Sequence, residues 1–134
     1  MATQMTRAPV ALVDLSEAEF TLQLIGTKTN PGLARMVGWR CYHTLRSKGS
    51  EAGYPDWTLV RERVMFVETK ASKTPVSPAQ KEWIRALLVA GAEAYLVRPE
   101  HLQDMATVLG YRGVFPQALL AHTRLWDYTQ EAIA

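Results

Sequence analysis

The chain has little cysteine and no long apolar run. Cys41 is the only cysteine among 134 residues, so no internal disulfide can form. No apolar stretch approaches the ~18 residues that span a membrane, and the N-terminal segment has only a brief apolar run before its acidic residues, unlike a signal peptide. These absences predict a soluble cytoplasmic protein with no membrane segment, since such low cysteine use suits a reducing compartment.

Acidic residues are missing from one segment. Between Phe20 and Ser50 there is no Asp or Glu, although the whole chain has 13. The same segment carries five basic residues, which are Lys28, Arg35, Arg40, Arg46 and Lys48. A one-sided basic segment is a pattern typical of phosphate binding. The alternative is a solvated face that happens to lack acidic residues.

The remaining composition is that of a single globular domain, with 48% hydrophobic and 21% charged residues. Ser16 and Ser77 each begin a helix-capping pattern, with Glu19 and Gln80 three residues later. We expect helices at 16–25, 33–37, 77–91, 99–109 and 116–133, and strands at 39–44, 56–60, 64–70 and 92–97. The strand–helix–strand order between residues 64 and 97 predicts an α/β fold, a mixed β-sheet flanked by helices.

Three charged residues interrupt the central strands. Asp56 begins one strand, and Glu68 and Lys70 end the next. Side chains two residues apart in a strand point to the same face, about 6.6 Å apart along the chain. Antiparallel pairing of the two strands would bring Asp56 level with Glu68 and Lys70. We therefore expect two carboxylates and one amine at one corner of the sheet.

The chemistry of this corner points to a metal ion. Two adjacent carboxylates repel one another and lose solvation energy on burial. A divalent hard cation removes this conflict, because Mg²⁺ is commonly held by one or two carboxylates, water and a substrate phosphate. Lys70 would orient or deprotonate a metal-activated water, or stabilise the charge of the transition state. This is the chemistry of phosphodiester hydrolysis.

Short motifs connect this corner to a known family. Pro55–Asp56 followed by Glu68–Lys70 matches the PD-(D/E)xK pattern of the restriction-endonuclease-like nucleases. The further matching pieces are Gly38–Trp39, Tyr42–His43, Gln80–Trp83 and Val97–Pro99. With them, residues 16–109 resemble the virus-type replication-repair nuclease (VRR-NUC) family. The resemblance implies a restriction-endonuclease-like αβββαβ core, an N-terminal extension at 1–15 and extra C-terminal helices at 110–134.

The resemblance also implies site residues and a cofactor, Mg²⁺ or Mn²⁺. The implied catalytic residues are Asp56, Glu68, Lys70 and Gln80, and the implied metal ligands are Asp56, Glu68 and the backbone carbonyl of Thr69. Glu19 is the best match for a further metal-binding glutamate, although "GTKTNPG" at 26–32 resembles an insertion that departs from the family pattern. A helix cap explains both Glu19 and Gln80 as an alternative.

DNA is the expected partner, contacted through its backbone. The residues expected to contact it are Arg40, His43, Thr44, Arg46, Ser47, Lys48 and Lys73. His43 shares a predicted strand face with Trp39 and Cys41, so a satisfied core histidine is an equal alternative. His101 and His122 are expected at the surface.

Together these features predict a Mg²⁺- or Mn²⁺-dependent endodeoxyribonuclease of a bacterium or its virus. By the resemblance it would act on branched DNA, such as Holliday junctions, in replication, recombination or repair, and it would be a homodimer. The last predicted helix offers a dimer face of Leu119, Leu120, Leu125 and Trp126, or else it packs on its own domain. The alternative function is a non-catalytic DNA-binding or scaffold protein that kept the nuclease fold.

Overall fold

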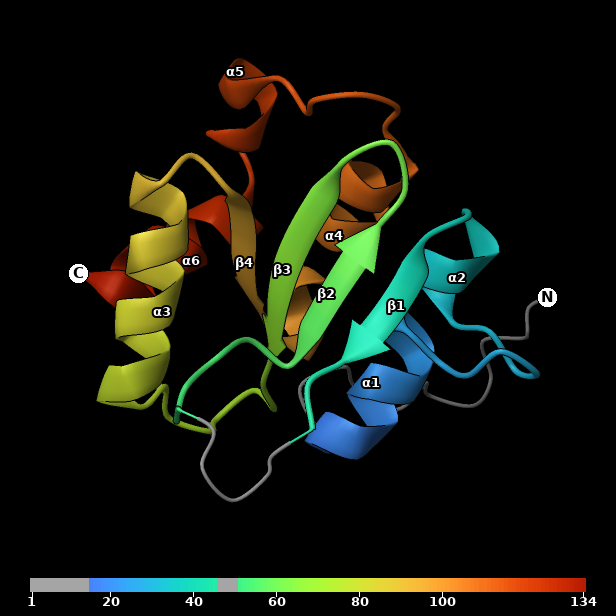
Figure 1. The fold of residues 1–134 in the computed structure, drawn as a ribbon, viewed down its shortest axis with the longest axis horizontal. Helices are drawn as coiled ribbons and strands as arrows, with labels where there is room; N and C mark the ends of the chain where they lie inside the picture. The colour runs from blue at the N-terminus through green and yellow to red at the C-terminus, as the bar shows by residue number, and fades with distance from the viewer. Residues whose placement is uncertain (1–14, 46–50) are drawn as a thin grey trace, which may run out of the picture.

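The centre of the fold is a four-stranded mixed sheet. A computed structural model of the chain describes residues 15–45 and 51–134 (Figure 1). The strands lie side by side in the order β1 (Arg40–His43), β2 (Trp57–Val60), β3 (Val64–Thr69) and β4 (Glu93–Val97). The first two pairs are antiparallel, whereas β4 runs parallel to β3. The predicted α/β class and mixed sheet are therefore confirmed.

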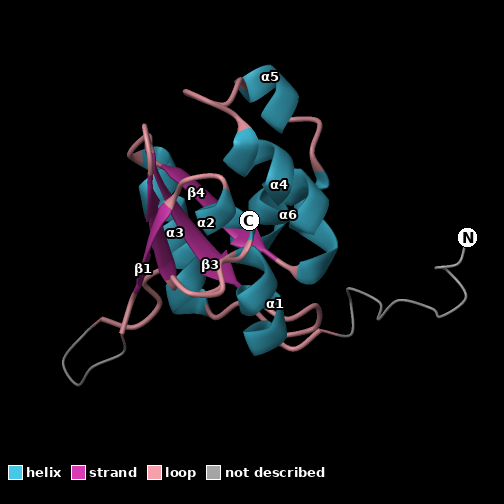
Figure 2. Ribbon diagram, turned by 90° about the vertical axis from the view of Figure 1, so that its right-hand side faces the viewer, coloured by secondary structure: helices cyan, strands magenta, loops and turns pink. Residues whose placement is uncertain are grey.

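Helices lie on both sides of this sheet (Figure 2). They are α1 (Glu17–Leu24), α2 (Leu33–Met36), α3 (Pro78–Val89), α4 (Leu102–Gly110), α5 (Gln117–Leu120) and α6 (Arg124–Ile133), with a short 3₁₀ helix, η3 (Pro99–His101), before α4. Among the helices of the described residues, none is long and apolar enough to cross a membrane. The capping boxes predicted at Ser16 and Ser77 are both present and begin α1 and α3.

The core is divided between the two faces of the sheet because β3 is interior and buries both of its faces. Met65 and Val67 are fully buried in the larger cluster, which α1 and α4 complete. Phe66, between them, packs in the second cluster with Ile84 of α3. The apolar run of β3 is therefore that of an interior strand, which helices cover on both sides.

Two predicted helices differ in the structure. The helix expected at 99–109 begins as η3 and becomes α-helical only at Leu102. The single helix expected at 116–133 is wrong, because α5 and α6 are separate. The break occurs at Thr123, whose backbone is extended and whose Oγ1 accepts a hydrogen bond from the Trp126 N–H at 3.0 Å. A threonine cap of this kind satisfies a free N–H at the start of a new helix.

The break between α5 and α6 also changes the predicted dimer face. Leu120 is 6% exposed and Leu125 is 0% exposed, and both belong to the larger core cluster. Trp126 packs against the same cluster, so only Leu119, at 53% exposure, remains open to a second molecule. Helix α6 packs instead against β4, where the Thr129 Oγ1 accepts a hydrogen bond from the Leu96 N–H at 3.2 Å.

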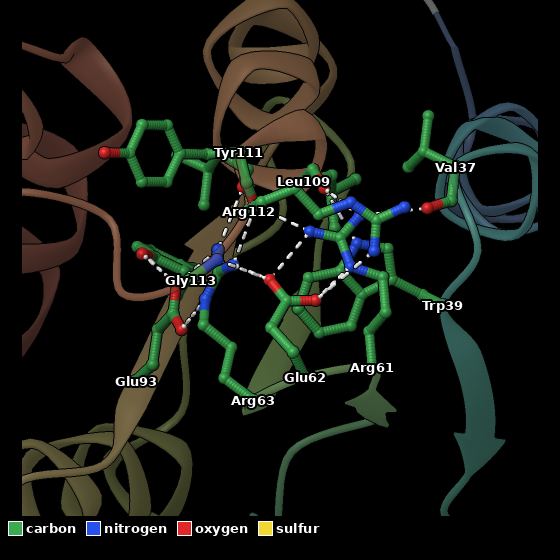
Figure 3. A network of polar contacts seen from close by, with 12 residues as sticks. Val37, Trp39, Arg61, Glu62, Arg63, Glu93, Leu109, Tyr111, Arg112 and Gly113 are labelled. Atoms are coloured by element: carbon green, nitrogen blue, oxygen red, sulfur yellow. Dashed lines mark hydrogen bonds and ion pairs between the residues drawn. The ribbon is translucent and has the colours of Figure 1, made fainter.

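The turn between β2 and β3 holds a charged cluster formed by Arg61, Glu62 and Arg63 (Figure 3). The guanidinium groups of Arg61 and Arg63 lie over the ring of Trp39, at 4.6 and 5.0 Å from its centroid. Arg63 also pairs with the Glu93 carboxylate at 2.7 Å. The hydrogen bond from Arg61 holds the pKa of Glu62 well below its usual range. Each charge in this cluster therefore has an opposite charge beside it.

The same two arginines bind the carbonyl groups at the end of α4. Arg61 donates to the Leu109 carbonyl at 2.9 Å, and Arg63 donates to the Val108 carbonyl at 2.9 Å. Both also donate to the Tyr111 carbonyl. The last carbonyls of a helix lack partners within it and carry the negative end of its dipole. The turn thus fixes the hairpin to α4, which a short polar loop in the sequence does not predict.

Candidate active site

The strand register brings the three predicted charged residues to the end of β3. Trp57 lies opposite Val67, which places Asp56 level with Glu68. The Asp56 N–H donates to the Glu68 Oε1 at 3.2 Å, and the Thr69 Oγ1 donates to the Asp56 Oδ2 at 3.2 Å. Two carboxylates separated by twelve residues in the chain are therefore neighbours, as the hairpin geometry predicted.

Gln80 reaches this pair from the first turn of α3. Its Nε2 donates to the Glu68 Oε2 at 2.9 Å, while its Oε1 accepts from the Ser77 N–H at 2.9 Å. The side chain is 5% exposed. The two interpretations of Gln80 are thus compatible: the cap occupies the amide oxygen, and this leaves the amide nitrogen to face Glu68.

The electrostatics of the site are unfavourable to a second negative charge. Glu68 is 2% exposed. Burial is the largest cause of the rise in the pKa of Glu68 to about 9, and the Asp56 carboxylate adds to this rise through its charge and a hydrogen bond between the two side chains. The charge of Lys70 opposes this change. Lys70 is itself only 8% exposed. The protein therefore places two carboxyl groups and an ammonium in a poorly solvated corner, a combination that burial alone disfavours.

The donor atoms in this corner fit a hard divalent cation. Asp56 and Glu68 supply carboxylate oxygens. Continuing the strand register places Pro55 opposite Thr69, and proline has no N–H with which to bind the Thr69 carbonyl across the ladder. Across residues 15–45 and 51–134, no group of three or more His, Cys, Asp or Glu side chains is arranged to hold a metal. The protein ligands at this corner would therefore be two carboxylates and one backbone carbonyl, which leave room for the water and phosphate that Mg²⁺ commonly requires.

Glu19 lies in the cap of α1. Its Oε1 accepts from the Ser16 N–H at 2.9 Å, and its own N–H donates to the Ser16 Oγ at 3.1 Å. These hydrogen bonds lower the pKa of Glu19. The carboxylate is exposed and serves the helix end, so the structure supports the cap interpretation of this residue.

The predicted DNA-contacting residues other than Thr44 fall into two groups. Arg46, Ser47 and Lys48 lie outside the described residues. Arg40, His43 and Lys73 are exposed. His43 stacks on Trp57 with ring centroids 4.6 Å apart, so its interpretation as a core histidine is wrong.

Thr44 has a structural role next to the site. Its N–H donates to the Asp56 carbonyl and its Oγ1 donates to the Pro55 carbonyl, both at 2.8 Å. These two bonds hold the backbone that carries the Asp56 carboxylate.

Two buried residues near the end of β4 were not predicted as part of the site. Arg98, directly after β4, is 8% exposed, and its guanidinium donates to the carbonyl of Ala71, the residue after Lys70. His101 is 6% exposed rather than at the surface, and its Nδ1 accepts from the Arg98 N–H at 3.2 Å. Burial lowers the pKa of His101. The sequence signal was the spacing of three between Arg98 and His101 before a helix, the same spacing as in the two serine caps.

The comparisons with known proteins agree with this geometry. The family model of the VRR-NUC domain matches residues 7–100, which include every residue of the corner and Gln80. Searches of the curated proteins and of the solved structures gave no match. A nuclease domain implies that the chain binds DNA and hydrolyses phosphodiester bonds. On the match to most of its length, the chain belongs to the VRR-NUC family.

Proposed function

We propose that the protein is a Mg²⁺- or Mn²⁺-dependent DNA endonuclease with its active site at Asp56, Glu68 and Lys70. The observation that supports this most strongly is the buried Glu68 carboxyl, which lies beside the partly buried Asp56 carboxylate and the buried Lys70. Burial first, and then the charge of Asp56, raise the pKa of Glu68 to about 9 in the metal-free protein. A purely structural role would not require such an arrangement, because charges are costly to bury unless they are paired.

Each residue of the corner has a distinct task in this proposal. The carboxylates of Asp56 and Glu68, with the Thr69 carbonyl, would hold the cation. When bound, the cation lowers the pKa of a water molecule and offsets the charge of the phosphate. The Lys70 ammonium donates to the attacking water or to a phosphate oxygen, and the Gln80 Nε2 keeps the Glu68 carboxylate in place.

The proposed substrate is branched DNA, such as a Holliday junction, recognised by its shape. Arg40, His43 and Lys73 are exposed, and contacts to phosphates position a protein without reading the base sequence. Arg46–Lys48 add basic and hydroxyl groups to the same predicted set. The predicted context is DNA recombination or repair in the cytoplasm of a bacterium or of a virus-infected cell.

We further propose that the protein acts as a homodimer. A four-way junction presents two equivalent strands, and a two-fold pair of active sites matches that symmetry. Because Leu120 and Leu125 pack in the core of their own domain, the second copy would contact a surface that extends from α6 to α3 and the segment before α5. Val89 and Val114 are 84% and 83% exposed, and they line a cavity of about 530 Å³ beside α5. We expect sedimentation velocity to find a dimer that Val114→Glu dissociates; a monomeric wild type, with and without junction DNA, would contradict this part of the proposal.

The activity is tested with a panel of four-way junction, flap, single-stranded and duplex DNA, each with and without Mg²⁺ or Mn²⁺. Wild-type protein should cut at least one branched DNA only in the presence of metal, and Lys70→Ala should not. Lys81→Ala, the same substitution on α3, is the matched control and should cut like wild type. The mechanism is wrong if no DNA is cut or if Lys70→Ala retains full activity.

Calorimetric titration with Mn²⁺ separates the endonuclease from the non-catalytic alternative. The wild type should bind Mn²⁺ and Asp56→Ala should not. A wild type that binds junction DNA but neither Mn²⁺ nor Mg²⁺ would instead be a DNA-binding or scaffold protein with a retained nuclease fold.

A further inference from the structure

The backbone around Lys70 is held by residues from the end of β4. The Lys70 N–H donates to the Val97 carbonyl at 3.0 Å. On the other side of Lys70, the Arg98 guanidinium donates to the Ala71 carbonyl. Two consecutive residues, Val97 at the end of β4 and Arg98 after it, thus bind the peptide group before Lys70 and the one after Ala71. The position of its ammonium depends on both bonds, because the side chain starts from this short segment.

Arg98 is itself held by a residue of the last helix. Its guanidinium lies over the ring of Tyr128 in α6, 4.8 Å from the centroid. The ring of His101 contacts the same tyrosine at 5.0 Å and accepts the Arg98 N–H. The Tyr128 hydroxyl is buried without a hydrogen-bond partner in the part of the chain that the structure describes. The geometry therefore places Arg98 mainly against the ring, although the nearby guanidinium also opposes the rise that burial causes in the pKa of the Tyr128 hydroxyl.

Helix α6 is placed well for this role. It packs against β4, and Thr129, the residue after Tyr128, is 0% exposed and accepts the Leu96 N–H. This hydrogen bond from the Leu96 N–H joins α6 to β4 two residues before Arg98. Figure 1 shows α6 beside β4 at the far side of the sheet from β1. This helix lies wholly beyond residue 100, where the match to the family model ends.

We infer that α6 is part of the support of the active site: Tyr128 positions Arg98, and Arg98 positions Lys70. Tyr128 and Arg98 are positioning residues, since neither is placed against substrate or metal. The inference rests on the proposed function in so far as Lys70 is the catalytic lysine. It assigns a catalytic consequence to a helix that the family match does not include.

The test compares Tyr128→Leu, which removes the ring, with Tyr128→Phe, which keeps it. Arg98→Lys is a second variant that keeps the charge but lacks the planar guanidinium, and Asp127→Asn is the control on an exposed position of α6. All variants are made in the full chain. Three quantities are measured: kcat and KM for the DNA that the wild type cuts, Mn²⁺ affinity, and hydrogen exchange of the Lys70 amide by NMR in metal-free protein.

We expect Tyr128→Leu and Arg98→Lys to lower kcat about tenfold or more, as a misplaced catalytic group does. KM and Mn²⁺ affinity should change little, because the carboxylates are held by other residues. The Lys70 amide should exchange faster in the same two variants. Tyr128→Phe should recover most of the kcat and the protection, and Asp127→Asn should match the wild type.

Two results would overturn the inference. One is a kcat of Tyr128→Leu and Arg98→Lys equal to that of wild type once corrected for the folded fraction. The other is unchanged exchange of the Lys70 amide in both variants. If the wild type cuts no DNA, the proposed function fails, but the exchange rates still decide whether Tyr128 and Arg98 hold the Lys70 backbone.

Discussion

The β2–β3 hairpin carries a charged cluster at each end, and the two clusters differ in how their charges are compensated. At the turn, Arg63 faces the Glu93 carboxylate and Arg61 faces Glu62. The remaining N–H groups of both arginines reach helix-end carbonyls. At the open end, Asp56 and Glu68 face one another instead.

This difference separates a structural cluster from a functional one. At the turn, each donor has an acceptor of suitable charge, so the cluster stabilises the fold and needs no ligand. At the open end, the like charges and burial leave the Glu68 carboxyl with a pKa of about 9. Perturbed ionisable groups of this kind are characteristic of sites that bind ligands or act in catalysis. Substitutions at the two ends should therefore have opposite effects on activity and stability.

Asp56→Asn should have the largest effect. It removes a proposed metal ligand, so we expect cleavage to fall on the order of 10³-fold and Mn²⁺ binding to be lost. The metal-free protein should become more stable at pH 10, above the pKa of Glu68, because the ionised Glu68 no longer faces a second carboxylate. Single-turnover cleavage and urea unfolding measure the two effects, with Glu51→Gln at an exposed carboxylate as control. A destabilised metal-free Asp56→Asn would mean that the open end is as well compensated as the turn.

Arg63→Ala should show the reverse behaviour. The substitution leaves the Glu93 carboxylate and the Val108 carbonyl without their partner, which we expect to cost roughly 3 kcal/mol of unfolding free energy. Activity per folded molecule should not change. Arg112→Ala is the control: its side chain is 73% exposed and lies 3.7 Å from Glu62, so the effect should stay within about 0.5 kcal/mol. Loss of cleavage in folded Arg63→Ala would break the distinction between the two ends.

The stability of the metal-free protein should fall as the pH rises from about 5 to 9. The pKa of Glu68 is about 9 in the folded protein and 4.5 as a model value. The folded state therefore binds more protons than the unfolded state between these values, and the stabilising protonation is lost as the pH rises through the folded pKa. We expect a decrease of roughly 1–3 kcal/mol.

Urea unfolding at pH 5, 7 and 9 measures this decrease, and Glu68→Gln should remove most of it. Metal affinity should rise with pH through the same range, since the cation competes with the proton on Glu68. A flat stability profile for the wild type would show that Glu68 is charged throughout and that the open end is compensated in another way.

Glu19→Ala should have the smallest effect. Its carboxylate serves the α1 cap, so the substitution should lower Tm slightly and leave Mn²⁺ affinity and cleavage at their wild-type values. A marked loss of metal affinity would place Glu19 in the metal site, as the sequence resemblance implies. The cluster at the open end of the hairpin would then include a third carboxylate.

Much of the fold and the centre of the site could be predicted because their signals are local. The apolar run of β3 and the caps at Ser16 and Ser77 are properties of a few consecutive residues. The meeting of Asp56 with Glu68 needs one further step, the antiparallel register of a hairpin. The same reasoning is wrong for 116–133, where the sequence pattern predicts one helix although Thr123 caps a second one.

The rest depends on contacts between residues far apart in the chain. Nothing near Arg61 or Arg63 in the sequence shows that the end of α4 will lie beside the turn. His43 is exposed because β1 ends at the rim of the sheet beside Trp57, although its spacing matched a buried face. Arg98 and Tyr128 meet only because α6 returns to β4.

The sequence by itself determined the elements and the hairpin corner with its two carboxylates and lysine, since strand period and turn length act over a few residues. Only the tertiary structure decided which charges would be compensated. The partners of the turn come from β4 and α4, whereas the corner receives from α3 the uncharged amide of Gln80. Burial and pairing depend on the whole packed chain, and they distinguish the structural end of this hairpin from the end that we propose binds metal and cuts DNA.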